Sequence, residues 1–161
     1  MPTSILHLPF MMAAAQPSRL RASNYSAHSV FRIRWSDLQD GRVSRVAMAH
    51  FFEDMRVIMM RELLGERFGT SAWRAVARAI SIEHLASARI NPPNLELVGG
   101  ISGIGKSSYT FALGAFQNGC CVALGDAVGV RVDENSRISP LDAQARAMLE
   151  RYRMRVPKEA N

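Results

Sequence analysis

The 161-residue chain is long enough for one domain with a single core, and 48% hydrophobic with 21% charged residues is typical of a globular protein. The net charge of +6 comes mainly from arginine and favours an anionic partner, such as a phosphate-bearing small molecule. No dense basic run with interleaved aromatic residues occurs, which argues against a nucleic-acid-binding protein. Cys120 and Cys121 are adjacent and suggest neither a disulfide framework nor a metal site, so we expect a reducing, cytoplasmic compartment.

The N-terminal part differs from the rest of the chain. We predict a flexible extension over residues 1–27, a single domain over residues 28–155 and a tail over residues 156–161. Ile5 to Ala15 is apolar, as in a secretory signal, but no Lys or Arg precedes it. An extension, or a start site at Met11 or Met12, therefore explains these residues better than a signal peptide.

A strand and a long helix are predicted next. Val30 to Ser36 alternates apolar and polar residues, as in a half-buried strand. Val43 to Leu64 has the spacing of a helix that is apolar nearly all round, and Gly65 offers its stop. Such a helix is normally buried, and its charged residues argue against a membrane span.

The remainder of the chain predicts strands that can enclose this helix. They are expected at Trp73 to Leu85, Leu95 to Ile104, Ser107 to Phe116 and Cys120 to Val132, and Pro140 begins a short amphipathic helix. The first of these strands is expected to place Val76, Ile80 and Ile82 on one side. The sequence thus predicts an α+β fold, in which an antiparallel sheet wraps a long central helix and a short C-terminal helix follows.

The last predicted strand has one large-residue face and one small-residue face. Valine and leucine line the first, at Val122, Leu124, Val128, Val130 and Val132; alanine and glycine line the second, at Ala123, Gly125, Ala127 and Gly129. We expect the large face to pack against the helix. The small face is then free for a neighbouring subunit or is simply exposed.

One motif imitates a nucleotide-binding loop. Gly100 to Ser107 matches the phosphate-binding pattern GxxxxGK[ST], which requires a strand before it and a helix after it. The residues from Ser107 to Phe116 instead alternate with period two, and too few residues remain for further βα units. We therefore predict a strand-to-strand turn that binds no nucleotide.

Several local sequences resemble one family. Arg34-Trp35-Ser36-Asp37-Leu38 resembles the RWxD opening of the 4-hydroxybenzoyl-CoA thioesterase-like branch of the hotdog superfamily. His50 to Arg56 is similar to that branch's helix segment, Ile104 to Ser108 to its IGRSS turn, and Pro140 to Leu149 to its terminal helix. The resemblance covers roughly residues 29–150. It implies a hotdog fold, a homodimer or dimer of dimers, and hydrolysis of an acyl-CoA or acyl-carrier thioester to free acid and thiol. Coenzyme A enters as part of the substrate, with no separate cofactor and no metal.

The turn into the helix departs from this branch. The branch carries DxDxxGHVNN there, and the second Asp is its catalytic carboxylate. The turn from Asp37 to Arg45 is one residue shorter. Alignment from the left puts Gln39 at the catalytic position, and a gap allows Asp40 to take it. The altered turn supports an alternative, a non-catalytic hotdog protein that binds an acyl or aromatic ligand. A hotdog dehydratase is weaker, because no His-containing hydratase motif is recognisable.

Thioester hydrolysis requires a carboxylate to activate water or attack the carbonyl carbon, and donors for the oxyanion. A helix N-terminus supplies unpaired N–H groups and a positive dipole end. The candidate catalytic residues are Asp40, Asp37 and Gly41, and the candidate substrate-binding residues are Arg42, Val43, Ser44, Arg45, Lys106, Ser107 and Ser108. By resemblance, the two serines reach the site from a partner subunit.

The two aspartates are not equivalent. Asp40 precedes Gly41 directly, so Asp40→Asn is expected to lower turnover about a hundredfold, and Asp37→Asn to affect mainly folding or affinity. Either residue alone is equally well explained as a helix cap. Glu53 is an alternative acid on the helix.

Overall fold

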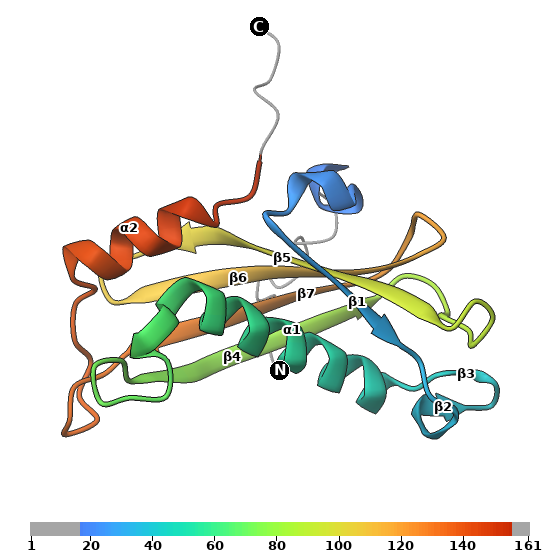
Figure 1. Cartoon of the computed structure of the whole chain (residues 1–161), viewed down its shortest axis with the longest axis horizontal. Helices are drawn as coiled ribbons and strands as arrows, with labels where there is room; N and C mark the ends of the chain where they lie inside the picture. Colours follow the sequence, from blue (N-terminus) through green and yellow to red (C-terminus); the bar gives the residue numbers. More distant parts are fainter. Residues whose placement is uncertain (1–16, 156–161) are drawn as a thin grey trace, which may run out of the picture.

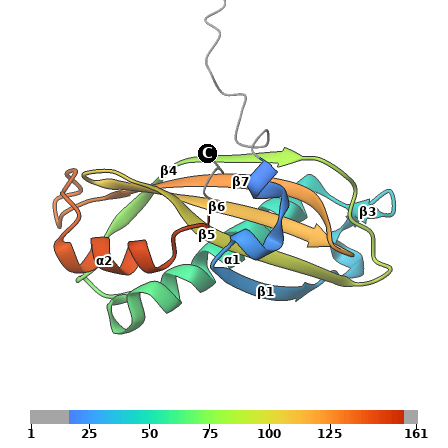
Figure 2. The same cartoon turned by 90° about the horizontal axis from the view of Figure 1, so that it is seen from above.

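The computed structural model describes residues 17–155, which form a five-stranded antiparallel sheet with a long helix across one face (Figure 1). The strands are β1 (Ala27–Arg32), β4 (Ala75–His84), β5 (Asn94–Ile104), β6 (Ser108–Gln117) and β7 (Cys120–Arg131), in the order β1-β5-β6-β7-β4. Helix α1 (Arg45–Leu64) crosses this sheet, and α2 (Ala143–Arg151) lies beside the C-terminal half of α1 (Figure 2). The predicted α+β architecture is confirmed.

Helix α1 is buried because its apolar residues spread around most of its circumference. Met55 and Met59 are completely inaccessible to solvent, and Phe51 and Phe52 are nearly so. The Ser44 hydroxyl caps the first turn by accepting the Ala47 N–H at 3.0 Å. Gly65 ends the helix with φ +52°, a backbone conformation that glycine adopts without steric cost.

The first strand lies earlier in the chain than expected. We predicted Val30 to Ser36, but β1 ends at Arg32, and a 3-10 turn, η3 (Trp35–Asp37), follows. The Asp37 carboxylate stabilises this turn by accepting the Arg34 N–H at 2.8 Å. Trp35 is consequently 78% exposed and does not join the core.

The two faces of β7 are the reverse of those expected. A Cβ atom on Gly125 would lie 3.0 Å from the Phe52 ring of α1, so the small-residue face packs against the helix. Leu124 pairs with Gly114, which faces Tyr25 on the opposite side of the sheet. The prediction that the large face packs on α1 was therefore wrong for β7 from Leu124 onward, whereas Val122, beside a register shift, belongs to the core that includes α1. Methionine and phenylalanine side chains of α1 fill the space, and only small residues leave room for them.

The alternation of side chains along β4 also differs from the prediction. Its register shifts between Ala77 and Ala79, so Val76 pairs with Val130 whereas Ile80 pairs with Ala127. Val76 and Ile80 therefore lie on opposite faces, contrary to the prediction, and only Ile80 shares the helix-facing side with Ile82. The extra residue of a β-bulge causes this change, because it reverses the alternation of side chains.

Residues 17–24, which we assigned to a flexible extension, pack on the outer face of the sheet, the face away from α1. They form two 3-10 turns, η1 (Pro17–Leu20) and η2 (Ala22–Asn24). Arg19 is 4% exposed, and its guanidinium contacts both carboxylate oxygens of Asp126 on β7, at 2.8 and 3.0 Å. Tyr25 packs there with Val98, Ala112 and Phe116. Residues 1–16 and the predicted tail, 156–161, lie outside the described residues.

Candidate functional site

The turn predicted to hold the catalytic group is a β-hairpin. Strands β2 (Leu38–Gln39) and β3 (Arg42–Val43) pair, and Asp40 and Gly41 form the two-residue turn with φ values of +52° and +74°. Positive φ at both central residues is the geometry of a type I′ turn, and an Asp-Gly pair favours it. The hairpin projects beyond the N-terminal end of α1 (Figure 1).

The helix begins later than expected. We predicted Val43 as its first residue, but α1 starts at Arg45 with Ser44 as its N-cap. Gly41 and Arg42 therefore lie before the helix, and the Val43 N–H donates to the Ala88 carbonyl at 2.8 Å. In the first helical turn, the Arg45 and Val46 N–H groups have no acceptor among residues 17–155.

Asp37 is held by its neighbours. Its side chain is 9% exposed, and its carboxylate accepts from the Arg34 backbone N–H at 2.8 Å and from the Arg34 guanidinium at 3.2 and 3.4 Å. Its carbonyl accepts the Ser44 N–H at 2.9 Å. These contacts give Asp37 a structural role in joining η3 to the start of α1.

Asp40 and Gln39 are both exposed. Asp40 makes no side-chain hydrogen bond to residues 17–155, so its carboxylate oxygens are free. It lies four residues before the helical N-cap, at the tip of the hairpin. Strand β3 and the N-cap Ser44 therefore separate Asp40 from the Arg45 and Val46 amides along the chain.

The Lys106 turn lies at the other end of the sheet. It joins β5 to β6 directly, and α2 packs beside it: the Lys106 carbonyl accepts the Leu141 N–H at 2.9 Å, and Gly105 donates its N–H to Ser108 at 2.7 Å. A strand, not a helix, follows the phosphate-loop-like motif, which confirms the predicted strand-to-strand turn.

The two parts of the predicted site do not meet in one chain. Ser108 begins β6 and Gln117 ends it, so these residues are about 30 Å apart along a strand of 10 residues. Gln117 lies at the same end as the α1 N-terminus, since it accepts the Arg89 N–H and the adjacent Ala88 contacts Val43. Ser107 and Ser108 therefore do not reach this end within one chain.

No catalytic role was predicted for His84, which the structure places near the first turn of α1. His84 ends β4 and pairs with Ala123, two residues after Ile82. Alternate strand residues share a face, so His84 lies on the helix-facing side. Partial burial and the nearby positive charge of Arg45 lower the pKa of His84 below its usual 6.5, so its imidazole is neutral at pH 7. In the sequence, the one feature that could have pointed to His84 is its position two residues after Ile82, which packs against the core.

Glu53, the alternative acid on the helix, is already paired. Glu53 and Arg56 form an ion pair one turn apart on α1, and the hydrogen bond from Arg56 lowers the pKa of the Glu53 carboxyl. His50 is exposed on the same helix. Neither Glu53 nor His50 adjoins the N-terminal turn.

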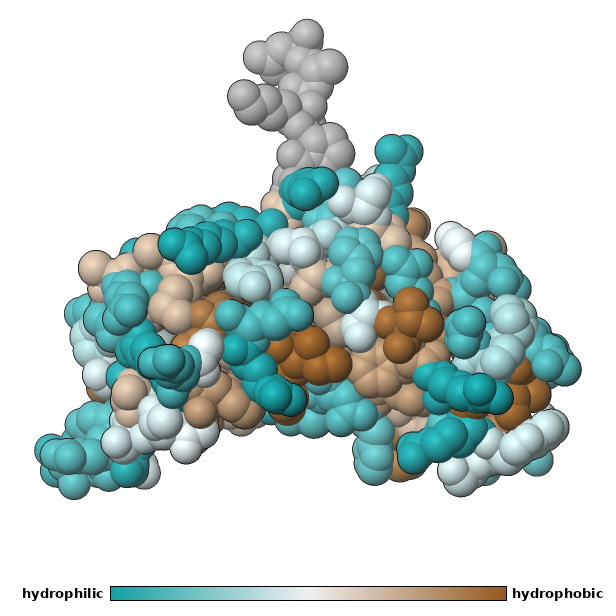
Figure 3. All heavy atoms as spheres, in the orientation of Figure 1, coloured by the Kyte–Doolittle hydropathy of each residue, from teal (hydrophilic) through white to brown (hydrophobic). Residues whose placement is uncertain are grey.

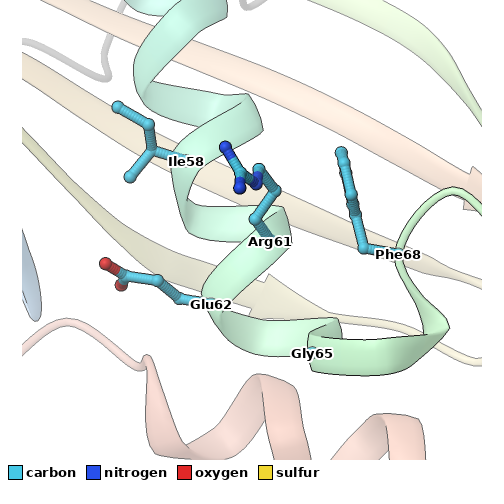
Figure 4. A pocket seen from close by; sticks show the side chains of 5 residues that line it. All are labelled: Ile58, Arg61, Glu62, Gly65 and Phe68. Carbon is cyan, nitrogen blue, oxygen red and sulfur yellow. The ribbon is translucent and has the colours of Figure 1, made fainter.

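A hollow of about 550 Å³ lies at the opposite end of α1 (Figure 4). Ile58, Arg61, Glu62, Gly65 and Phe68 line it. Figure 4 shows Arg61 and Phe68 together on one side of the helix and Glu62 on another, so no group of polar side chains converges in it. Teal and brown side chains are interspersed over the face seen in Figure 3, without one continuous apolar surface.

Two further classes of site are absent from the described part of the chain. Among residues 17–155, no three His, Cys, Asp or Glu side chains gather as metal ligands. No helix in this part of the chain is long and apolar enough to cross a membrane. The N-terminal turn of α1, with the free Arg45 and Val46 amides and the exposed Arg42 and Arg45 side chains, is the candidate site.

Comparison with known proteins shows the fold. A solved structure from Pseudomonas aeruginosa strain PAO1 superposes with a TM-score of 0.73 and 21% identity, covering 84% of this chain and 96% of that one. A predicted thioesterase from Bacillus stearothermophilus gives a TM-score of 0.71 and 21% identity, covering 81% and 98%. A thioesterase from Thermus thermophilus, solved with coenzyme A and Zn, gives 0.69 and 18% identity, covering 79% and 93%.

The chain has the hotdog fold. No family model matches the sequence, and no curated protein matches it either. The hotdog architecture expected from the resemblance is therefore confirmed, and the particular branch of the superfamily stays a prediction.

Proposed function

We propose that this hotdog protein hydrolyses an acyl-CoA or acyl-carrier thioester to the free acid and the thiol. The observation that carries the proposal is the N-terminus of α1, where the Arg45 and Val46 amides have no acceptor among the described residues. Amides at a helix N-terminus are suited to stabilise an oxyanion. Arg42, Arg45 and Arg89 are exposed at this end of the sheet and can attract the phosphates of coenzyme A. Solved thioesterases with this fold, one of them bound to coenzyme A, support the substrate class.

A second candidate follows from the two aspartates. The Asp37 carboxylate is already engaged, and an acid role for Asp40 requires the thioester to reach the hairpin tip. A protein that binds an acyl or aromatic ligand at the same helix N-terminus, without turnover, would need neither carboxylate. We rank this binding function second, because the fold recurs in thioesterases.

Thiol release across a panel of short, long and aromatic acyl-CoAs separates the two functions. Hydrolysis predicts release of free coenzyme A at a rate that saturates with substrate for at least one member of the panel. The binding function predicts saturable binding of a panel member by calorimetry with no thiol release. A protein that neither binds nor hydrolyses any member would contradict both.

We further propose that the functional unit contains two copies of the chain, joined along β4. This strand pairs only with β7 among the described strands, so its outer edge is unpaired, and Val76 and Ile80 are exposed on it. Antiparallel pairing of two β4 edges puts the start of one strand beside the end of the other. Ala75, at the start of β4, pairs with Arg131, whose N–H donates to the Ser107 carbonyl, so the start of the strand lies near the Ser107 turn. His84, at the end of β4, lies toward the N-terminal end of α1. Such a dimer would unite the two separated parts of the site.

The small-residue face of β7, which we expected to be free for a neighbouring subunit or simply exposed, is covered by α1. The outer face of the sheet is covered in part by residues 17–25, so a dimer of dimers through that face would first have to displace them.

In sedimentation velocity at micromolar concentration, we expect a species of twice the 17.8 kDa chain mass. Ile80→Arg should shift it to the monomer and abolish thiol release, because a charge at the paired edge opposes association and the composite site is lost. Val30→Arg, on the exposed side of edge strand β1, is the matched control and should remain dimeric. A wild-type protein that sediments only as a species of the single-chain mass would contradict the proposal.

A further inference from the structure

We propose that His84 is the proton acceptor for the water that attacks the thioester, in place of a carboxylate. This inference rests on the proposed hydrolase function and names the residue that performs its proton transfer. It is drawn from the position of His84 relative to the first turn of α1, and from the state of the acids around that turn.

The register of β4 against β7 places His84. Ile82 pairs with Gly125, whose Cα faces the Phe52 ring of α1, and His84 pairs with Ala123 with no bulge between them. His84 therefore lies on the same side of the sheet as α1, one strand repeat closer to the helix N-terminus. It is exposed, so a substrate at the Arg45 and Val46 amides can approach its ring.

The charged groups around His84 favour its neutral form. The positive charge of Arg45, the first residue of α1, is near enough to act on it, and Glu83 precedes it in β4 on the opposite face. Opposite His84, β7 presents only Ala123. A neutral imidazole is the form that accepts a proton, and a pKa below 6.5 keeps that form dominant at neutral pH.

The other titratable side chains near this end are unsuited to the same task. Arg34 occupies both oxygens of Asp37, and Asp40 projects from the hairpin tip. Glu53 is paired with Arg56 farther along α1. Among the residues that the structure describes, His84 alone combines a neutral basic nitrogen with a position on the helix-facing side toward the N-terminal end of α1.

The proposed step balances without a cofactor. The water O–H proton passes to the free ring nitrogen of His84 as the water oxygen bonds to the thioester carbonyl carbon. The carbonyl electrons move to oxygen, where the Arg45 and Val46 amides stabilise the oxyanion. The tetrahedral intermediate then collapses, the C–S bond breaks, and the thiolate takes the proton back from the His84 imidazolium. Free acid and thiol leave, and His84 is again neutral.

The pH dependence of thiol release tests this assignment on the full-length protein. The wild-type kcat/KM should rise as pH increases through a pKa below 6.5, because the neutral base forms there, and then reach a plateau. His84→Gln should lower the plateau value of kcat/KM about a hundredfold or more and should abolish the rise with pH that precedes it. Free imidazole should restore part of the turnover to His84→Ala, which a purely structural role would not allow.

His50→Gln, at an exposed histidine on α1 away from the first turn, is the matched control and should keep the wild-type profile. Melting temperature and sedimentation of each variant show that the fold is intact. If the wild type is active and His84→Gln has the same pH profile of kcat/KM, the inference is overturned and the hydrolase proposal stands. Loss of turnover in Asp40→Asn with no loss in His84→Gln would overturn it in favour of the carboxylate. A wild type that hydrolyses no panel member overturns both proposals.

Discussion

Arg19→Met is expected to lower the free energy of unfolding by about 3 kcal/mol, although Arg19 lies in a segment that was predicted to be a flexible extension. Its guanidinium donates to both oxygens of Asp126 and also to the Gly125 and Leu113 carbonyls, at 2.7 and 3.3 Å. Removing one member of a buried ion pair leaves the other charge without compensation, which typically costs about 3–5 kcal/mol. The Asp126 side chain is 22% exposed, so the lower end of that range applies.

Denaturant unfolding and thermal melting measure this effect. A loss of about 3 kcal/mol corresponds to a fall in melting temperature of roughly 6 to 12 °C for a domain of this size. Arg21→Met, at an exposed arginine on the same segment, should change stability little. The double variant Arg19→Met with Asp126→Leu should recover most of the loss, because no unpaired charge remains. Equal stability of Arg19→Met and wild type would show that the Arg19 ion pair does not stabilise the packing of residues 17–24 on the sheet.

Gly125→Val is expected to destabilise the protein by about 2 to 3 kcal/mol, although valine favours strands more than glycine does. A Cβ atom at this position would lie 3.0 and 3.1 Å from two carbons of the Phe52 ring, and the added methyl groups would press farther into α1. Overpacking a core forces side chains and backbone from their preferred positions. The experiment tests directly that the small-residue face of β7 packs on the helix.

Gly103→Val in β5 is the matched control, because its Cβ would be 3.7 Å from the nearest atom, an ordinary contact. It should be tolerated or stabilising. Phe52→Leu should relieve part of the cost of Gly125→Val by making room, although it costs stability in the wild type. If Gly125→Val is as stable as wild type, the large-residue face is the one that packs on α1, as the sequence alone suggested.

The order of elements could be predicted from local patterns, because each pattern is set by neighbours in the chain. The apolar spread from Val43 to Leu64 required burial, and the period-two alternation after Ser107 excluded a phosphate loop. Both conclusions hold in the structure. Gly65 also ends the helix where expected.

The faces of the strands were decided only by tertiary packing. Hydrophobicity suggested that the valines of β7 would meet the helix, but the volume of Phe52 and Met59 leaves room only for glycine at Gly125 and Gly99. One bulge at β4 reversed the side of Val76. Such choices depend on the size and position of side chains distant in sequence, which alternation does not encode.

The candidate site depended most on the tertiary structure. The sequence by itself determined an α+β chain with a buried helix, basic residues at the helix start and an altered Asp37 to Arg45 turn. Only the folded chain showed that Asp37 is occupied, that Asp40 lies on a hairpin tip, and that Ser108 is the length of β6 away. It also placed His84 on the helix-facing side of β4, within range of the Arg45 charge, although most of α1 and β4 separates the two residues in the chain. Chemistry of this kind depends on distance in space, and distance in space is set by how the helix and the sheet pack.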